Sequence, residues 1–421
     1  MTTNQIWDQT VFPEGANEAR DYFGYSLAAG DFSNDGNGDL AIGTPNEDIG
    51  TGQYDFDMGT VNVIYGSTSG LDRDDSQLWL QDDLSGSFTE RFDYFGHSLA
   101  AGDFDSDGYD DLVIGTPYEH IGATIYSGIV EIIYGTSGGL NSADNQFWNQ
   151  TAFPSEEDEA LDYFGWSLAP GDYDGDGYDD LAIGAPGEGF GTIGLTPSGQ
   201  VNVLYGSLSG LTSSGSQSWD QNALVPGNNY ASDYFGGSLA AGDYDGDGYD
   251  DLAISAVGKD TGGVTDAGKV DVLYGSSSGL TSNGNQIWTQ DELTGSPREA
   301  YDGFGQVLAV GDFNNDGYDD LAVGTPNEDI NTLTKAGTVN IIYGSSSGLT
   351  SNGNQFWHQD TTGVGEIAEA FDNFGASLAV HDFDGDGYDD LAIGVPGENI
   401  GSITDSGVVQ ILYGSSSGLI V

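Results

Sequence analysis

The sequence predicts an all-β protein, a six-bladed β-propeller with four-stranded blades. Glycine accounts for 68 of the 421 residues, about twice its ordinary share, and it recurs periodically. A Phe-Gly dipeptide returns every 69 to 72 residues, and a tryptophan and a Tyr-Gly pair keep the same spacing. Each repeat also holds four short runs of strand-forming residues between turn residues. Radial repetition of such four-stranded units is the signature of a propeller.

The repeats occupy the whole chain, so the sequence predicts one domain. Their Phe-Gly dipeptides begin at Phe23, Phe95, Phe164, Phe235, Phe304 and Phe374. The expected repeats are about 4–71, 72–140, 141–211, 212–280, 281–349 and 350–421. The chain starts with a fourth-strand sequence at 4–7 and ends after a third-strand sequence at 408–413. We therefore expect the N-terminal strand to pair into the last blade and close the ring, which would remove an unpaired edge.

The second repeat shows the expected elements in order. Its strands are expected at 95–100, 111–115, 129–134 and 146–150. No window of ten residues has a helical pattern of apolar side chains, and the frequent glycines would destabilise a helix. The fourth strand of every repeat carries one tryptophan, and this regular placement favours packing between blades over sugar stacking.

The charge of the chain is strongly acidic. Lys and Arg total 7 while Asp and Glu total 68, so the formal net charge is −61. This charge excludes nucleic acid as a direct partner, because phosphates would be repelled, and it argues against anionic membrane surfaces. The chain has no cysteine, which excludes disulfides and thiolate metal sites. No apolar run suggests membrane insertion, and residues 1–15 show no signal peptide.

An acidic loop with the pattern D-x-D-x-D-G-x-x-D follows the first strand of each repeat. Carboxylates at alternating positions of a tight turn converge, and the glycine supplies the positive φ that the turn requires. Side chains at positions 1, 3, 5 and 9 and the carbonyl of position 7 form the oxygen-rich ligand set that calcium prefers. Ligation by oxygen alone disfavours zinc and copper, and magnesium prefers a more rigid octahedron.

The sequence therefore predicts about six calcium ions as cofactors. The expected ligands, at positions 1, 3, 5, 7 and 9 of each loop, are Asp31, Ser33, Asp35, Asn37 and Asp39; Asp103, Asp105, Asp107, Tyr109 and Asp111; Asp172, Asp174, Asp176, Tyr178 and Asp180; Asp243, Asp245, Asp247, Tyr249 and Asp251; Asp312, Asn314, Asp316, Tyr318 and Asp320; and Asp382, Asp384, Asp386, Tyr388 and Asp390. The first site is expected to be the weakest, because Ser33 replaces a carboxylate.

These motifs resemble the FG-GAP repeats of integrin alpha-subunit propellers. The shared features are the Phe-Gly strand, the acidic loop and a Gly-x-Pro sequence at 43–45, 115–117, 184–186, 324–326 and 394–396. The resemblance implies a calcium-stiffened propeller used in extracellular adhesion, with the calcium loops away from the ligand face. Two departures are the count of six repeats, where integrins have seven blades, and Ser255-Ala256-Val257 in place of Gly-x-Pro.

The resemblance also implies an aromatic cup, built by the residues after Phe-Gly, that holds a basic residue of the integrin beta subunit. The matching positions are Tyr25, His97, Trp166, Gly237, Gln306 and Ala376. Only two of the six are aromatic, which argues against an integrin-type beta partner. This position diverges between otherwise uniform repeats, which leaves either neutral drift or an asymmetric binding site. In the second case the candidate ligand contacts are Tyr25, His97, Trp166 and Gln306.

The loops that join strands 2 to 3 and strands 4 to 1 vary in length and sequence, so we expect an unknown protein or glycan ligand on that face. Acidic residues there, such as Glu47, Asp48, Asp55 and Asp57, favour a cationic or cation-bridged ligand.

The sequence favours a module without enzymatic activity. The four histidines, at 97, 120, 358 and 381, fall at different repeat positions and form no catalytic motif. The leading hypothesis is a calcium-binding adhesion or recognition module, extracellular or at the cell surface. A structural scaffold without a specific ligand, a lectin-like carbohydrate binder and an enzyme remain as alternatives.

Overall fold

The computed structural model describes residues 5–9, 20–48, 57–86, 89–154, 156–189, 197–225, 231–295, 297–365 and 367–421. The chain forms two compact units. The first comprises Met1–Pro170 with Gly177–Trp219, and the second comprises Gly171–Asp176 with Asp220–Val421.

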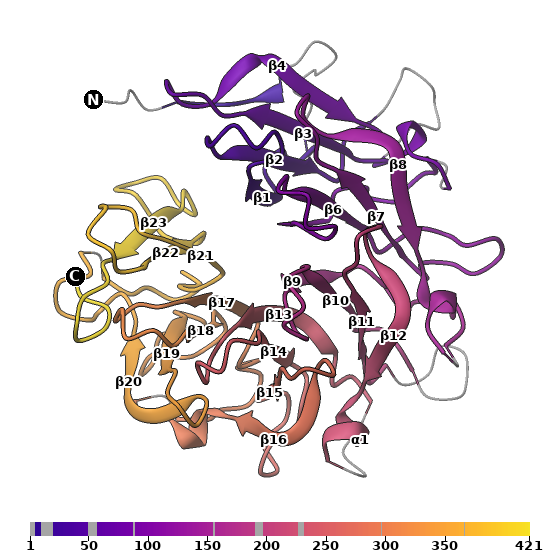
Figure 1. Cartoon of the computed structure of the whole chain (residues 1–421). Coiled ribbons are helices and arrows are strands. Elements are labelled where there is room, and N and C mark those ends of the chain that lie inside the picture. Colours follow the sequence, from indigo (N-terminus) through magenta and orange to yellow (C-terminus); the bar gives the residue numbers. More distant parts are fainter. Residues whose placement is uncertain are drawn as a thin grey trace. The chain divides into compact units, whose positions relative to one another are not determined.

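The first unit contains three four-stranded antiparallel sheets (Figure 1). In each sheet the strands lie side by side in chain order, from β1 to β4, from β5 to β8 and from β9 to β12. The strands are β1 (Ser26–Gly30), β2 (Asp39–Thr44), β3 (Thr60–Tyr65), β4 (Asp72–Trp79), β5 (Ser98–Gly102), β6 (Asp111–Thr116), β7 (Ile129–Tyr134), β8 (Asn141–Trp148), β9 (Ser167–Gly171), β10 (Asp180–Ala185), β11 (Gln200–Tyr205) and β12 (Thr212–Trp219). Short 3-10 turns, η2 (Gln81–Asp83) and η3 (Gln150–Ala152), follow β4 and β8.

The second unit repeats this arrangement, with sheets β13 to β16, β17 to β20 and β21 to β23. Its elements are α1 (Gln221–Leu224), β13 (Phe235–Gly242), β14 (Asp251–Ala256), β15 (Val270–Tyr274), β16 (Thr281–Trp288), η4 (Gln290–Glu292), β17 (Val307–Gly311), β18 (Asp320–Thr325), β19 (Thr338–Tyr343), β20 (Thr350–Trp357), β21 (Ser377–His381), β22 (Asp390–Val395) and β23 (Val408–Leu412). The predicted all-β class, with six propeller blades, is confirmed; the last sheet has three strands among the described residues.

The first and fourth strands of the second repeat differ most from the prediction. In the second repeat the first strand begins at Ser98 rather than Phe95, because Tyr94 and Gly96 adopt positive φ and turn the chain before the strand. The fourth strand begins at Asn141, earlier than expected, and a bulge between Ile132 and Tyr134 accommodates its extra length.

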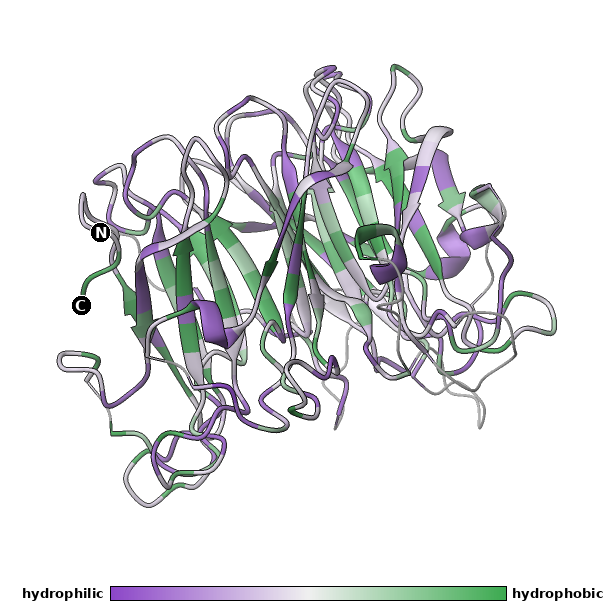
Figure 2. Ribbon diagram, turned by 90° about the horizontal axis from the view of Figure 1, so that it is seen from below, coloured by the Kyte–Doolittle hydropathy of each residue, from purple (hydrophilic) through white to green (hydrophobic). Residues whose placement is uncertain are grey.

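The hydrophobic cores lie between neighbouring sheets. Trp79, at the end of β4, packs in one cluster with Ile133 of the next sheet and with Phe95, which precedes that sheet in the chain. Trp148 occupies the same place beside Phe164. Figure 2 shows the hydrophobic residues concentrated in the strands and the hydrophilic ones in the connecting loops. The prediction that these tryptophans pack between blades is confirmed.

A polar junction also joins neighbouring sheets. The Tyr65 hydroxyl donates to Gln77 Oε1 at 2.6 Å and accepts the backbone N–H of Leu140 in the next repeat at 2.8 Å. Gln77 Nε2 donates to the Leu140 carbonyl at 3.1 Å. The same three groups meet at Tyr343, Gln355 and Leu419 in the second unit.

The N-terminal segment repeats one bond of this junction, the one from the glutamine side chain to the leucine carbonyl, at the first sheet. Gln5 Nε2 donates to the Leu71 carbonyl at 2.8 Å, and Trp7 packs beside Ile42 and Ile64. Residues 5–8 form no strand, and residue 4 lies outside the described residues. The predicted single domain, and the closing of a ring by this segment, stay predictions.

Candidate metal centres and aromatic cluster

Each acidic loop is held by its own backbone. In the second repeat, Asp103 Oδ1 accepts the N–H of Asp107 at 3.0 Å, and its Oδ2 accepts the N–H of Gly108 at 2.9 Å. Asp107 Oδ1 accepts the N–H of Tyr109 at 3.1 Å. Gly108 has a φ of 91°, in the left-handed region that favours glycine. These bonds fold the short loop back on itself and gather its carboxylates.

Three of the predicted ligand positions converge. One carboxylate oxygen from each of Asp103, Asp105 and Asp111 lies within 4.8 Å of the others, and the first, third and ninth positions of the fourth repeat, Asp243, Asp245 and Asp251, form the same group. The position-5 aspartates belong to neither of these groups. The donor set consists of oxygen alone, which fits a hard divalent cation such as calcium.

The position-9 aspartate is the buried member of each group. Asp111 is 1% exposed, and its two oxygens accept the N–H groups of Phe104 and Gly135 at 3.1 and 2.9 Å. Burial, together with the neighbouring loop carboxylates, raises the pKa of Asp111 to about 8. Burial likewise raises the pKa of Asp251 and of Asp320 to about 8, and that of Asp39 to about 6. A bound cation would stabilise the ionised form of these aspartates and so offset the free-energy cost of burying their charge.

The eighth loop position, which sequence reasoning missed, links successive loops. Asp110 Oδ2 accepts the backbone N–H of Asp31 in the preceding repeat at 2.7 Å, and the Asp31 carbonyl accepts the N–H of Asp110 at 3.2 Å. Asp319 makes the same pair of bonds to Asp243. The repeated Asp-Asp dipeptide was the available sequence signal, since only the second aspartate fits the metal pattern.

An aromatic cluster lies at the opposite end of the sheets in the first unit. It comprises Tyr25, Tyr94, His97, Tyr118, Tyr126, Tyr163 and Trp166. The Tyr118 ring centroid lies 4.9 Å from that of Tyr94, 5.3 Å from Tyr163 and 6.2 Å from Trp166. Tyr118 follows Gly-Thr-Pro, a position that sequence reasoning did not single out.

Three of the four predicted ligand contacts meet in this cluster. His97 lies between Tyr25 and Trp166, with ring centroids 5.2 and 4.7 Å away. Burial lowers the pKa of His97 to about 4, so its ring is neutral at pH 7. Tyr25 is 56% exposed and keeps the cluster open to solvent. The fourth predicted contact, Gln306, belongs to the second unit and accepts a bond from Asn327 Nδ2 at 2.9 Å. The role of all four as ligand contacts stays a prediction, and Asp55 lies outside the described residues.

Tyrosines stand where the backbone is strained. The residue before Phe-Gly has a φ of 54° to 62° in all six repeats. The fifth and sixth repeats place Gly303 and Asn373 there, which suit this conformation, while the first four repeats place tyrosines. Two of these four tyrosines, Tyr94 and Tyr163, belong to the aromatic cluster, where each contacts Tyr118.

The FG-GAP repeat sequence profile matches six segments that together cover more than half of the chain: 23–56, 95–128, 164–204, 235–273, 304–341 and 374–412. Integrin alpha-5 of Xenopus laevis is 34% identical over 250 residues, which is 57% of this chain and 20% of that protein. Integrin alpha-PS2 of Drosophila melanogaster is 32% identical over 245 residues, covering 57% of this chain and 15% of that protein. The chain thus spans a fifth or less of these relatives.

A mouse phosphatidylinositol-glycan-specific phospholipase D is 32% identical over 185 residues, covering 43% of this chain and 20% of that protein. The solved rhamnogalacturonan lyase YesW aligns over 93% of this chain and 67% of its own, with 13% identity and a TM-score of 0.39. That likeness is too distant to bear on function. Among the described residues, no helix is long and apolar enough to cross a membrane.

Proposed function

Because the chain belongs to the FG-GAP repeat family, we propose that it is a calcium-stabilised recognition module that works outside the cell or at its surface. The acidic loops would bind calcium through the carboxylates at positions 1, 3 and 9, which converge in the second, third and fourth repeats. The calcium has a structural role in this proposal: it neutralises buried carboxylates and stiffens the ends of the sheets.

The aromatic cluster is the proposed ligand-binding surface, and it is the observation that carries the recognition function. Its half-buried rings offer flat π faces, which bind either a cationic side chain or the apolar face of a sugar ring. The formal charge of −61 favours the cation. A basic segment of a protein partner is therefore the first candidate ligand, and a neutral glycan is the second.

The proposed module binds without catalysing a reaction. The relatives include both integrin alpha subunits and a phospholipase D, and each match covers a fifth or less of the relative. We propose that in this chain the segment shared with these relatives serves for recognition. An integrin-type beta subunit is not the proposed partner, because four of the six cup positions lack an aromatic side chain.

Calcium affinity is expected to rise between about pH 6 and about pH 8. A carboxyl group must lose its proton to bind calcium, and the pKa values of Asp111, Asp251 and Asp320 are about 8 in the metal-free loops. Binding at pH 7 should therefore release protons. Calorimetric titration in two buffers of different ionisation enthalpy measures both the calcium affinity and the number of protons released. Constant affinity with no proton release would contradict carboxylate ligation.

Replacing Tyr234 by asparagine is expected to stabilise the fold by about 0.5 to 1 kcal/mol, because asparagine tolerates the left-handed backbone better. Tyr234 is 41% exposed with a φ of 54°, and the sixth repeat already has Asn373 at this position. Tyr234→Phe is the matched control, since it keeps an aromatic side chain at the same left-handed backbone position. Urea unfolding compares the two. An equal loss of stability in both variants would show that the tyrosine at position 234 does not destabilise the fold.

A further inference from the structure

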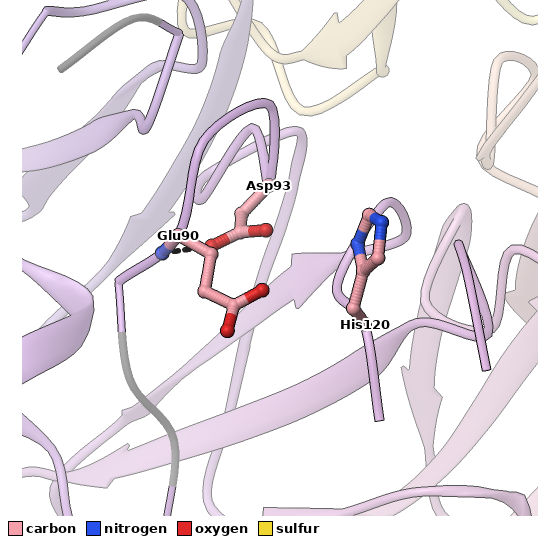
Figure 3. A group of neighbouring side chains, drawn as sticks. All are labelled: Glu90, Asp93 and His120. Carbon is pink, nitrogen blue, oxygen red and sulfur yellow. Dashed lines mark hydrogen bonds between the residues drawn. The ribbon is translucent and has the colours of Figure 1, made fainter. Parts of the chain in front are cut away.

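A buried pair of acids recurs at the end of the sheets that lies away from the acidic loops. In the second repeat the pair is Asp93, before Phe-Gly, and Glu119, after Gly-Thr-Pro, which are 0% and 7% exposed. Gln81, in the turn after β4, donates its Nε2 to Glu119 Oε2 at 2.8 Å. The backbone N–H of Glu90 donates to Asp93 Oδ2, as the dashed line in Figure 3 shows.

The two buried carboxyl groups of this pair interact with each other. In the third repeat the equivalent residues Asp162 and Glu188 each place a carboxylate oxygen within 4.8 Å of the other. A hydrogen bond between two carboxyl groups requires a proton on one of them. Asp93 Oδ1 is buried and has no hydrogen-bond partner in the described part of the chain. The titratable groups that face the pair are Glu90 and His120 in the adjoining loops and Glu131 on β7. Burial, and then the neighbouring carboxyls, raise the pKa of both Asp93 and Glu119, since two adjacent buried carboxylates cannot both ionise cheaply.

The same arrangement recurs in other repeats. Gln150 donates to Glu188 Oε2 at 2.8 Å beside Asp162, and Glu156, Asp158 and Glu159 face that pair. In the fifth repeat Gln290 donates to Glu328, which interacts with Asp302 beside Glu299. Burial raises the pKa of all four acids in these two pairs.

The fourth repeat has a lysine where the others have the glutamate. Lys259 Nζ donates to Asp233 Oδ2 at 2.9 Å, and both side chains are at most 5% exposed. Gln221, the counterpart of Gln81, is fully buried, and its side chain finds no hydrogen-bond partner among the described residues. The lysine therefore supplies a donor to the aspartate at the place where the other repeats have only a second carboxyl group.

We propose that each aspartate–glutamate pair holds one proton between its two carboxyl groups. This proton joins the loop before the first strand to the loop after the second strand, as the Lys259 ammonium does in the fourth repeat. The folded chain therefore binds more protons than the unfolded chain above about pH 4, where free carboxyls titrate. The stability that each pair contributes is then lost as the pH rises through neutrality.

The first test replaces Glu119 by glutamine, whose amide can donate to Asp93 and cannot titrate. In saturating calcium, the melting temperature of the unmodified protein should fall between about pH 6 and about pH 9. The fall should be smaller in the variant, and the difference between the two falls should be on the order of 2 °C. Glu157→Gln, at an exposed glutamate, is the control and should follow the unmodified protein. Parallel curves for all three proteins would overturn the proposal.

A second test reads the proton directly. Infrared spectra of the calcium-loaded protein at neutral pH should contain the carbonyl band of a protonated carboxylic acid, weaker in Glu119→Gln and unchanged in Glu157→Gln. No such band in the unmodified protein would overturn the proposal. Loss of one calcium ion from Glu119→Gln would also overturn it, because a metal ion would then occupy the pair. Lys259→Glu should create a new pair and make the fall in melting temperature steeper.

Discussion

Replacing Asp105 by alanine is expected to remove one calcium ion and to lower the free energy of unfolding in calcium-containing buffer by about 2 to 3 kcal/mol. An ion present at a hundred times its dissociation constant stabilises the folded state by about 2.7 kcal/mol, and that linkage disappears with the site. In chelator the loss should vanish or reverse. Burial and the charges of Asp107 and Asp103 raise the pKa of Asp105. Removal of this carboxylate therefore reduces the repulsion between like charges in the metal-free loop.

Mass spectrometry under native conditions counts the ions, and urea unfolding with calcium or with chelator measures the stability. Asp144→Ala is the matched control, because Asp144 is an exposed aspartate outside the acidic loops. It should leave both the ion count and the calcium dependence unchanged. If Asp105→Ala binds as many ions as the unmodified protein, calcium ligation at this loop is wrong.

Replacing Tyr118 by alanine is expected to weaken ligand binding by about thirtyfold or more, which corresponds to about 2 kcal/mol. Tyr118 lies in ring contact with five other residues of the cluster, so its loss removes one ring and the support of five others. Truncation of a central aromatic residue commonly has such an effect in binding sites.

The measurement is a binding screen with arginine-rich peptides and with neutral oligosaccharides, first on the unmodified protein and then on Tyr118→Ala. Peptide binding that weakens with salt would support the cationic ligand, and oligosaccharide binding insensitive to salt would support the glycan. Tyr413→Ala, at a partly exposed tyrosine outside the cluster, is the control. A ligand that binds both variants as tightly as the unmodified protein would place recognition elsewhere.

The sequence predicts the blades well because their signals are local and repeated. The second and third strands of the second repeat are found at Asp111–Thr116 and Ile129–Tyr134, close to the expected 111–115 and 129–134. The packing of Trp79 between sheets also follows from its regular place in a strand. Because the same pattern occurs in six copies, a strand that is ambiguous in one repeat can be assigned from the others.

The parts that the sequence does not reveal depend on contacts between repeats. Asp110 resembles another metal ligand in sequence, yet its side chain accepts the N–H of Asp31 in the preceding repeat. Tyr118 belongs to a loop that varies, so no periodicity marks it, and only the fold places it beside Tyr163. The acid pairs combine residues about 26 positions apart, as in Asp93 and Glu119, and their burial is a property of the packed loops.

The junction of Tyr65, Gln77 and Leu140 has a consequence for how such chains evolve. Since the corresponding groups meet again at Tyr343, Gln355 and Leu419, a duplicated or deleted repeat would find a matching surface on either neighbour. The buried lysines of the fourth repeat do not disturb this exchange, because Lys259 and Lys269 pair with Asp233 and Asp271 of the same repeat. A change in the number of repeats would therefore reuse this junction rather than require a new interface, and the loops of individual copies could diverge without affecting it.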